Sequence, residues 1–310
     1  MREPLIVITG ATASGKSAVA VRLAEGVKGE IVSADSMQIY RHMDIGTAKP
    51  SAAERARVAH HMIDIIEPDA PYSVAQYQAD ADRAIVEVGA RGRLPILVGG
   101  TGLYVQAVWD GLDFPIAGPD REFRAAMQAE AERVGTAALH ARLAGIDPAA
   151  AARIHPNDQK RIIRALEVHH LTGQPISRFH TGKESARYRA LAFGLKAPRR
   201  DLNQRIDARI DDMMSRGLLE EVRGLLDRGY HEGLISMKAL GYQQLAEHLR
   251  GRCDLEAAVE RFKTATHQFA KRQMTWFGRD RRIRWVELAE PTDVGYAADQ
   301  IVAGWQAFDR

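Results

Sequence analysis

The residues with the most specific chemistry form a glycine-rich loop near the start of the chain, made of Gly10, Ala11, Thr12, Ala13, Ser14, Gly15, Lys16 and Ser17. The G-x4-G-K-S spacing lets the backbone wrap tightly, so that its N–H groups can surround an anion. Lys16 adds a mobile positive charge, and Ser17 is placed to hold Mg²⁺ on the same phosphates. The loop therefore predicts a phosphorylated ligand, without showing whether that ligand is a nucleotide.

Two further segments carry polar groups at points where an apolar run stops. Asp35 follows Glu30–Ser33, and its carboxylate could bind Mg²⁺, cap a turn or act as a general base. Thr101 stands in Gly99–Tyr104, which a simple strand-to-helix turn would explain as well as a site. The N-K-x-D and D-x-x-G motifs of nucleotide switch proteins are absent from the sequence.

Alternating strands and helices must position these residues. Apolar runs at 4–9, 30–33, 94–98 and 189–195 predict buried strands, and Ile283–Val286 predicts a last one. A capping box, Ser73 with Gln76, opens a helix that runs to about Arg91. This order predicts an α/β fold, a P-loop NTPase-like parallel sheet flanked by helices, with ligands at the carboxyl ends of the strands.

The pattern changes near 113–119, where two prolines and a glycine predict a hinge. From there to about residue 183 the segments are helical, including a helix that ends at Thr172 before Gly173. We therefore expect a core domain of residues 1–112 and 187–310, and a mostly helical insertion domain of residues 113–186.

The composition is that of an ordinary globular protein. The chain has 310 residues, of which 45% are apolar and 27% charged, which excludes a disordered protein. Cys253 is the only cysteine, so an intrachain disulfide and a cysteine-rich zinc site are excluded. No apolar stretch is long enough to span a membrane, and the start of the chain lacks the pattern of a signal peptide. We expect a soluble, cytoplasmic protein.

The net charge of +3 hides two basic segments. Residues 153–209 contain 13 basic and 5 acidic residues, and residues 261–284 contain 8 basic and 1 acidic. Such segments suit a polyanionic partner, although solvated helix faces would give the same pattern. Trp276 and Phe277, in the second segment, could stack on a base, but their helical spacing with other apolar residues favours a place in the core. The histidines show no metal-ligand spacing.

The chain resembles bacterial-type tRNA dimethylallyltransferases, also called tRNA isopentenyltransferases or the IPP transferase family. The resemblance runs along nearly the whole chain, and the join of the phosphate loop to Asp35–Pro50 is its most specific part. Ala11 departs from the expected proline, at a loop position that supplies no essential side chain. The matching blocks are Gly10–Ser17, Asp35–Tyr40, Asp44–Pro50, Gly99–Tyr104, His155–Glu167, Gly241-Tyr242 and Ala270–Trp276.

The resemblance implies a transfer reaction, in which N6 of adenosine 37 of a tRNA attacks C1 of dimethylallyl diphosphate and diphosphate leaves. It implies that Asp35 accepts the N6 proton, that Lys16 and Arg209 neutralise the leaving diphosphate, and that Thr101 is also catalytic. Mg²⁺ is the expected cofactor, and we expect a monomer that has no membrane partner. The tRNA contacts implied are Asp35, Ser36, Met37, Gln38, Thr101, Phe123, Gln159, Lys160, Arg161, Ile162, Ile163, Gly241, Tyr242 and Gln243.

Two rival functions fit part of the sequence. In a small-molecule P-loop kinase, Asp35 would activate a substrate hydroxyl and the helical insertion would act as a lid. That function predicts ATP binding and leaves the two basic segments without a role. A non-catalytic, ATP-dependent RNA-binding module would leave Asp35 and Thr101 unexplained.

Overall fold

The computed structural model describes residues 2–115, 118, 120–179, 187–288 and 293–309. It divides the chain into a core unit, residues 1–109 and 187–310, and a second unit, Asp110–Ala186. The boundary before the second unit thus lies three residues before the expected one, and the boundary after it lies at the expected residue.

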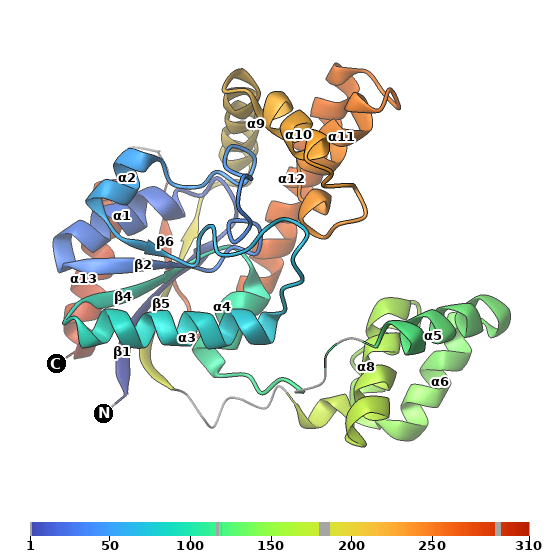
Figure 1. Cartoon of the computed structure of the whole chain (residues 1–310). Helices are drawn as coiled ribbons and strands as arrows, with labels where there is room; N and C mark the ends of the chain where they lie inside the picture. Colours follow the sequence, from blue (N-terminus) through green and yellow to red (C-terminus); the bar gives the residue numbers. More distant parts are fainter. Residues whose placement is uncertain (1, 116–117, 119, 180–186, 289–292, 310) are drawn as a thin grey trace. The chain divides into compact units, whose positions relative to one another are not determined.

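The core unit contains a six-stranded sheet whose paired strands all run parallel (Figure 1). This confirms the predicted fold class. The strand that follows the second unit, β5, pairs with β1 along the whole length of β1. The sheet order is β3-β2-β4-β1-β5-β6, with β1 (Glu3–Gly10), β2 (Gly29–Ser33), β3 (His60–His61), β4 (Leu94–Val98), β5 (Tyr188–Lys196) and β6 (Arg284–Glu287).

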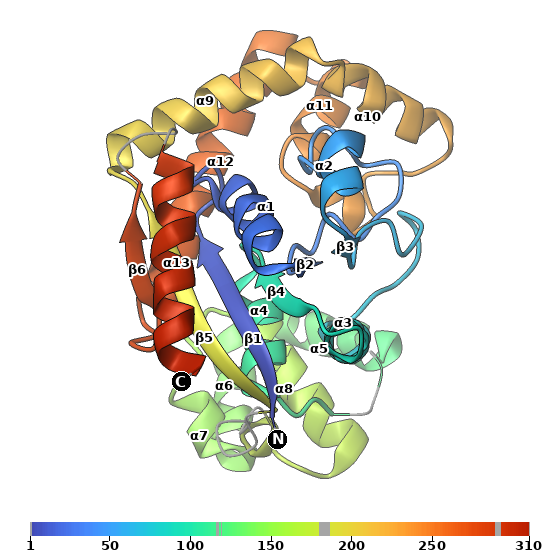
Figure 2. The same cartoon turned by 90° about the vertical axis from the view of Figure 1, so that its left-hand side faces the viewer.

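Helices cover both faces of the sheet, because alternate strand residues point to opposite sides. Ile6 and Ile8 of β1 pack toward α1 and α13, whereas Leu5 and Val7 pack toward α3 and α4 (Figures 1 and 2). All four side chains are fully buried, as expected for a central parallel strand. The bounds of these helices are α1 (Lys16–Val27), α3 (Val74–Ala90), α4 (Gly102–Asp110) and α13 (Val294–Asp309).

A third packed layer of the core unit is helical and rests on the segment that follows β2. Ile39, Tyr40 and Met43 of that segment pack among the buried side chains of four later helices. These helices are α9 (Arg199–Ser215), α10 (Leu218–Asp227), α11 (Tyr242–Leu249) and α12 (Leu255–Phe277). A short α2 (Ala52–Arg57) and a 3-10 turn, η3 (Ser236–Lys238), complete the described elements of this unit.

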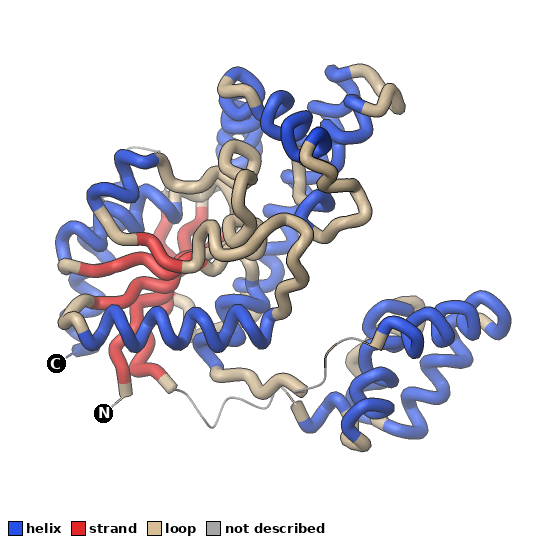
Figure 3. Tube along the Cα trace, in the orientation of Figure 1, coloured by secondary structure: helices blue, strands red, loops and turns tan. Residues whose placement is uncertain are grey.

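The described part of the second unit consists of helices and connecting loops, with no strand, as Figure 3 shows. Its small core contains Met127, Leu139, Leu143, Ile162 and Leu166. Asp158 caps α8 by accepting a hydrogen bond from the Arg161 amide at 3.2 Å. The elements are α5 (Arg121–Val134), α6 (Thr136–Ile146), α7 (Pro148–Ala151), α8 (Gln159–Thr172) and η1 (Ile176–Arg178).

A buried carboxylate joins two helices of the second unit. Glu167 of α8 has no exposed side-chain surface and accepts two hydrogen bonds from Arg124 of α5, at 2.7 and 2.8 Å. Arg164 and the Asp120 amide also donate to it, at 2.6 and 2.8 Å. Burial alone would raise the pKa of Glu167, but these hydrogen bonds lower it below its usual value. The network therefore stabilises the unit when Glu167 is ionised.

We expect Glu167→Ala to destabilise the second unit by about 3 kcal/mol, because two arginines and one amide lose a buried partner. All four tryptophans lie outside this unit, so tryptophan fluorescence would not report on its unfolding. Circular dichroism during urea unfolding therefore measures the effect. Because the folded pKa is lowered, the contribution of Glu167 is present above the usual glutamate pKa of 4.5 and is lost as the pH falls below it. Equal stability of parent and variant at pH 7 would contradict this role.

No helix in the described part of the chain is long and apolar enough to cross a membrane.

Candidate active site

A cavity of about 710 Å³ lies at the carboxyl ends of β1, β2 and β4, where the sheet meets α9 and α12. Lys16, Asp35, Thr101 and Arg209 all line it. The structure therefore brings together the four residues for which a catalytic role was expected. They come from four separate segments of the chain, which the strand order places around one opening.

The phosphate loop is open for an anion. Gly15 has φ of 88°, in the left-handed region, and α1 begins directly after it at Lys16. Among the described residues, the N–H groups of Gly15, Lys16 and Ser17 have no acceptor. The Ser14 hydroxyl is buried and also has no partner there. Unpaired donors at the start of a helix are the arrangement that binds phosphate oxygens.

The side chain of Lys16 folds back onto the same loop. Its Nζ donates a hydrogen bond to the Ala11 carbonyl at 2.5 Å. Burial, together with the positive charge of Arg209, lowers the pKa of Lys16 to about 7, and the charge of Asp35 opposes both. A bound diphosphate would supply the negative charge that favours protonated Lys16.

Arg209 is a second cation in the cavity wall. It lies on α9 and, within the described chain, forms no ion pair with a carboxylate. The pKa of Arg209 is lowered, mainly by burial and further by the charge of Arg216, whereas the charge of Asp35 opposes the shift. An arginine stays protonated in proteins, so Arg209 presents a partly buried positive charge to whatever occupies the cavity.

Asp35 uses one of its carboxylate oxygens to shape the segment after β2. Oδ1 accepts a hydrogen bond from the Met37 amide at 2.8 Å, which caps a turn. In the described chain, Oδ2 accepts no hydrogen bond. The turn-capping role is therefore observed for one oxygen, and the other remains available to a proton or a metal ion.

Thr101, in the loop after β4, holds the segment after β2 in place. Its Oγ1 accepts a hydrogen bond from the Ser36 amide at 3.0 Å and donates one to the Ser36 hydroxyl at 3.2 Å. Gln38 holds the next part, because its Oε1 accepts from Ser33 and its Nε2 donates to the carbonyls of Thr47 and Ala48. These contacts order the cavity wall. Both the oxygen and the nitrogen of the Gln38 amide already have hydrogen-bond partners within the protein.

Gln273 of α12 is a site residue to which sequence reasoning gave no role. Its Oε1 accepts a hydrogen bond from the Thr12 amide, and its Nε2 donates one to the Gly100 carbonyl, both at 2.8 Å. A Cβ on Gly100 would lie 2.2 Å from that Nε2, so only glycine permits the contact. Gln273 thus ties the phosphate loop to the loop of Thr101. Its place in the Ala270–Trp276 block was the only sequence signal.

Glu221 of α10 is a second residue that the sequence did not indicate. Its carboxylate accepts hydrogen bonds from the amides of Asp44, Ile45 and Gly46, at 2.9, 2.8 and 3.3 Å. It also accepts from the hydroxyl of Tyr242 at 2.6 Å. Glu221 therefore holds the segment that leads to Pro50 against the helical layer, through contacts between residues far apart in the sequence.

The residues expected to contact tRNA are partly exposed and partly buried. Tyr242 and Gly241 are buried in the core unit, whereas Gln243 is exposed. In the second unit, Ile162 and Ile163 are buried, so only the first residues of α8, Gln159, Lys160 and Arg161, present side chains to a partner.

Phe123 lies on α5 of the second unit. Its ring stacks on that of His170, with centroids 4.5 Å apart and an interplanar angle of 14°. His170 belongs to α8, so this stacked pair is one of the contacts that join the two helices. Phe123 therefore has a packing role within its unit, whichever partner the unit binds.

The interpretation of Trp276 and Phe277 as core residues is right for Phe277 and wrong for Trp276. Phe277 is 3% exposed and packs on the same face of the sheet as α3 and α4, whereas Trp276 is 42% exposed. The buried face of α12 follows Phe262, Thr266, Ala270, Gln273 and Phe277, and Trp276 lies at its edge. Its ring rests on Gly102, which has no side chain to displace it.

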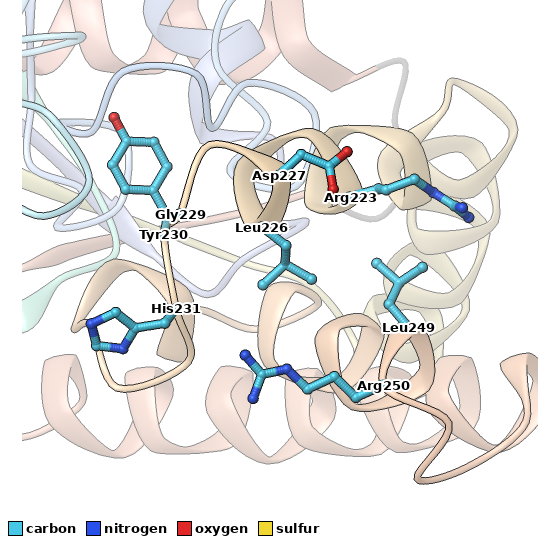
Figure 4. A pocket seen from close by; sticks show the side chains of 8 residues that line it. All are labelled: Arg223, Leu226, Asp227, Gly229, Tyr230, His231, Leu249 and Arg250. Carbon is cyan, nitrogen blue, oxygen red and sulfur yellow. The ribbon is translucent and has the colours of Figure 1, made fainter.

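A second hollow, of about 540 Å³, lies between α10 and α11 (Figure 4). Its wall contains Arg223 and Leu226 of α10 and Leu249 and Arg250 at the end of α11. It shares no lining residue with the first cavity. Arg250 already pairs with Glu232 at 2.8 Å, and the hollow contains no group predicted to do chemistry.

No cluster of three or more His, Cys, Asp or Glu side chains able to hold a metal ion occurs among the described residues. A magnesium ion in such a cavity needs only one or two protein oxygens when substrate phosphates supply others. The hydroxyl of Ser17 and the free oxygen of Asp35 line the same cavity and fit that requirement.

The fold and the cavity define a P-loop α/β protein in which a carboxylate lies beside the phosphate loop. The IPP transferase family model matches residues 38–281, and the isopentenyl transferase model matches residues 3–64. The chain belongs to the IPP transferase family.

Similar proteins cover nearly the whole chain. A tRNA dimethylallyltransferase of Desulforudis audaxviator is 50% identical over 96% of both chains, and one of Pelotomaculum thermopropionicum is 50% identical over 97% of this chain and 96% of its own. The crystal structure of a Bacillus halodurans tRNA isopentenylpyrophosphate transferase is 40% identical, with a TM-score of 0.72, and the match covers 99% and 98% of the two chains. A eukaryotic dimethylallyltransferase acting on tRNA gives a TM-score of 0.85 at 27% identity, over 99% of this chain and 80% of its own.

Proposed function

We propose that this enzyme transfers a dimethylallyl group from dimethylallyl diphosphate to N6 of adenosine 37 in tRNA and releases diphosphate. The observation that carries the proposal is the arrangement in one cavity of an open phosphate loop, two cations and a carboxylate with one free oxygen. The names of the similar proteins support dimethylallyl transfer to tRNA. All of these groups come from one chain, so the proposed reaction needs no second copy, and we propose that the enzyme acts as a monomer in the cytoplasm.

The reaction follows from the positions of the charges. The N6 lone pair forms a bond to C1 as the bond from C1 to the diphosphate oxygen breaks, and the electron pair leaves with the diphosphate. The loop amides, Lys16 and Arg209 stabilise the negative charge that develops on the leaving group. The free oxygen of Asp35 takes the proton from N6. The adenine must leave its stack to reach this depth.

Mg²⁺ is the cofactor that we propose. The hydroxyl of Ser17 would supply the protein oxygen, and the bound ion would neutralise charge on the diphosphate. Every other group in the proposed reaction belongs to this chain or to its substrates.

A direct test incubates the protein with radiolabelled dimethylallyl diphosphate, Mg²⁺ and bulk tRNA, followed by measurement of label in the RNA. We expect label only when all components are present, without added ATP. Label in RNA digests should co-migrate with prenylated adenosine. Absence of label, together with ATP-dependent modification of a small molecule, would favour a kinase.

We expect tRNA affinity to fall steeply with salt, because clustered cations contact phosphates and release counterions. Lys160 and Arg161 are exposed at the start of α8, within the first basic segment. Replacing both by alanine is expected to weaken tRNA binding and to reduce the slope of log K against log salt by about 1 for each phosphate that the variant no longer neutralises.

The matched control replaces Lys28 and Arg93, which are exposed directly before β2 and β4. These residues lie at the end of the sheet away from the cavity, and their removal changes the net charge equally. The control should keep the parent slope, and both variants should keep the parent affinity for dimethylallyl diphosphate. Identical slopes for the two double variants would show that α8 does not contact the RNA.

A further inference from the structure

We propose that Trp276 is a stacking platform for an unpaired nucleobase next to the reacting nucleotide of the RNA substrate. The inference rests on the proposed function, since it needs an RNA at the mouth of the cavity. Nothing in the reaction itself requires this side chain, because Trp276 does not line the cavity.

The first observation is the exposure of the ring. Trp276 is 42% exposed on α12, whereas Trp109 and Trp305 are 9% and 7% exposed. Leu103, which directly follows Gly102, is 39% exposed. Large apolar side chains that are left open to solvent in one place mark a surface that binds a partner.

The second observation is the position of the ring at the rim of the cavity. A Cβ on Gly102 would lie 2.4 Å from Cδ1 and Nε1 of Trp276, so the indole rests directly on the backbone at the start of α4. Gly102 follows Thr101, which lines the cavity, and Trp276 is one helical turn from Arg272 and Gln273, which also line it. A base that stacks on Trp276 would therefore be a close neighbour of a base that enters the cavity.

The third observation is that the platform is fixed in place. Gln273 anchors this turn of α12 to the Thr12 amide and to the Gly100 carbonyl, both at 2.8 Å. Gly102 lies against the Cδ1, Nε1 and Cγ atoms of the indole, and the residue remains 42% exposed. A rigid aromatic loses little conformational entropy when a base stacks on it, and such stacking is the usual way in which proteins hold unpaired RNA bases.

The charge around the platform favours a nucleic acid over a protein or a lipid tail. Lys271, Arg272 and Arg279 are exposed on the same stretch of the chain, and among the described residues no carboxylate pairs with them. Arg272 instead lies over the ring of Phe269, 5.8 Å from its centroid. Aromatic surface between unpaired cations matches the alternation of base and phosphate in a single strand.

The test uses a synthetic anticodon stem–loop RNA with 2-aminopurine at the position on either side of the target adenosine, in two separate RNAs. For one of the two RNAs, we expect Trp276→Ala to change the fluorescence of the bound probe and to weaken binding about 10-fold, the usual effect of removing one base stack. Trp276→Phe should recover most of both signals, because it restores an aromatic face. Tyr296→Ala, which removes an aromatic that is 59% exposed on α13, is the control and should behave as the parent.

Other measurements separate this inference from the proposed function. Affinity for dimethylallyl diphosphate and the circular dichroism melting curve should match those of the parent in all three variants. If the parent neither binds the stem–loop nor prenylates it, the proposed function fails. If the parent does both and Trp276→Ala binds both RNAs as the parent does, only the stacking platform is overturned, and the exposed ring serves a different partner.

Discussion

Replacing Lys16 by alanine is expected to slow prenyl transfer by about 10²–10³-fold, the usual cost of removing one preorganised group that stabilises a developing negative charge. Lys16 is the mobile cation of the phosphate loop, and its Nζ lies at the loop carbonyl of Ala11. The loop amides and Arg209 remain in the variant, so some transfer should persist. Single-turnover measurement at saturating substrate isolates the chemical step.

The same variant also distinguishes a leaving diphosphate from a bound nucleotide. If the loop holds diphosphate, inhibition by inorganic diphosphate should weaken in Lys16→Ala, and ATP should be neither consumed nor required by the parent. Lys28→Ala, at the other end of α1, removes a lysine without touching the cavity and should leave both measurements unchanged. Stoichiometric release of ADP during turnover would place the protein among the kinases.

Elements set by local patterns could be predicted from the sequence. The capping box of Ser73 and Gln76 forms at the start of α3, which ends at Ala90, one residue before the expected Arg91. Such signals depend on residues within one or two turns of each other, and buried strands depend on their own apolar runs. The two-residue strand β3 and the short α2 were missed, because so few residues carry no periodic signal.

The phosphate loop and Asp35 could be found because each stands where a strand ends, and parallel strands bring their ends together. The supporting contacts could not be found in this way. Gln273 reaches residues more than 170 positions away, and Glu221 does the same for the Asp44 segment. Trp276 was placed in the core because helical spacing does not show that Gly102 would leave room for the ring. Contacts between distant segments depend on the packed fold, which a single sequence pattern does not encode.

Replacing Asp35 by asparagine is expected to slow single-turnover prenyl transfer by about 10²-fold or more, within the range of general-base catalysis. The N6 amine is a poor nucleophile, because its lone pair is delocalised into the purine. It becomes cationic as it attacks C1, and a nearby carboxylate both stabilises that charge and takes the proton. At about 1.4 kcal/mol for each tenfold change, the expected loss is about 3 kcal/mol of transition-state stabilisation.

The geometry makes asparagine a clean substitution. The side-chain oxygen of asparagine can still accept the hydrogen bond that Oδ1 receives from the Met37 amide at 2.8 Å, so the turn after β2 should persist. The amide nitrogen takes the place of the oxygen that has no partner in the described chain, and it cannot accept a proton. Affinities for tRNA and for the Mg²⁺ complex of dimethylallyl diphosphate should stay within a few-fold of the parent. Asp69→Asn, which changes an exposed carboxylate away from the cavity, is the matched control.

A metal-binding role for Asp35 predicts a different result from the same variant. If the free oxygen serves only Mg²⁺, Asp35→Asn should lose Mg²⁺-dependent affinity for diphosphate, and the rate should recover as Mg²⁺ is raised. If it serves as the base, added Mg²⁺ leaves the slow rate unchanged, because the missing group is a proton acceptor and no ion replaces it. A titration of Mg²⁺ against the single-turnover rate of parent and variant decides between them, and metal rescue would refute the general-base role.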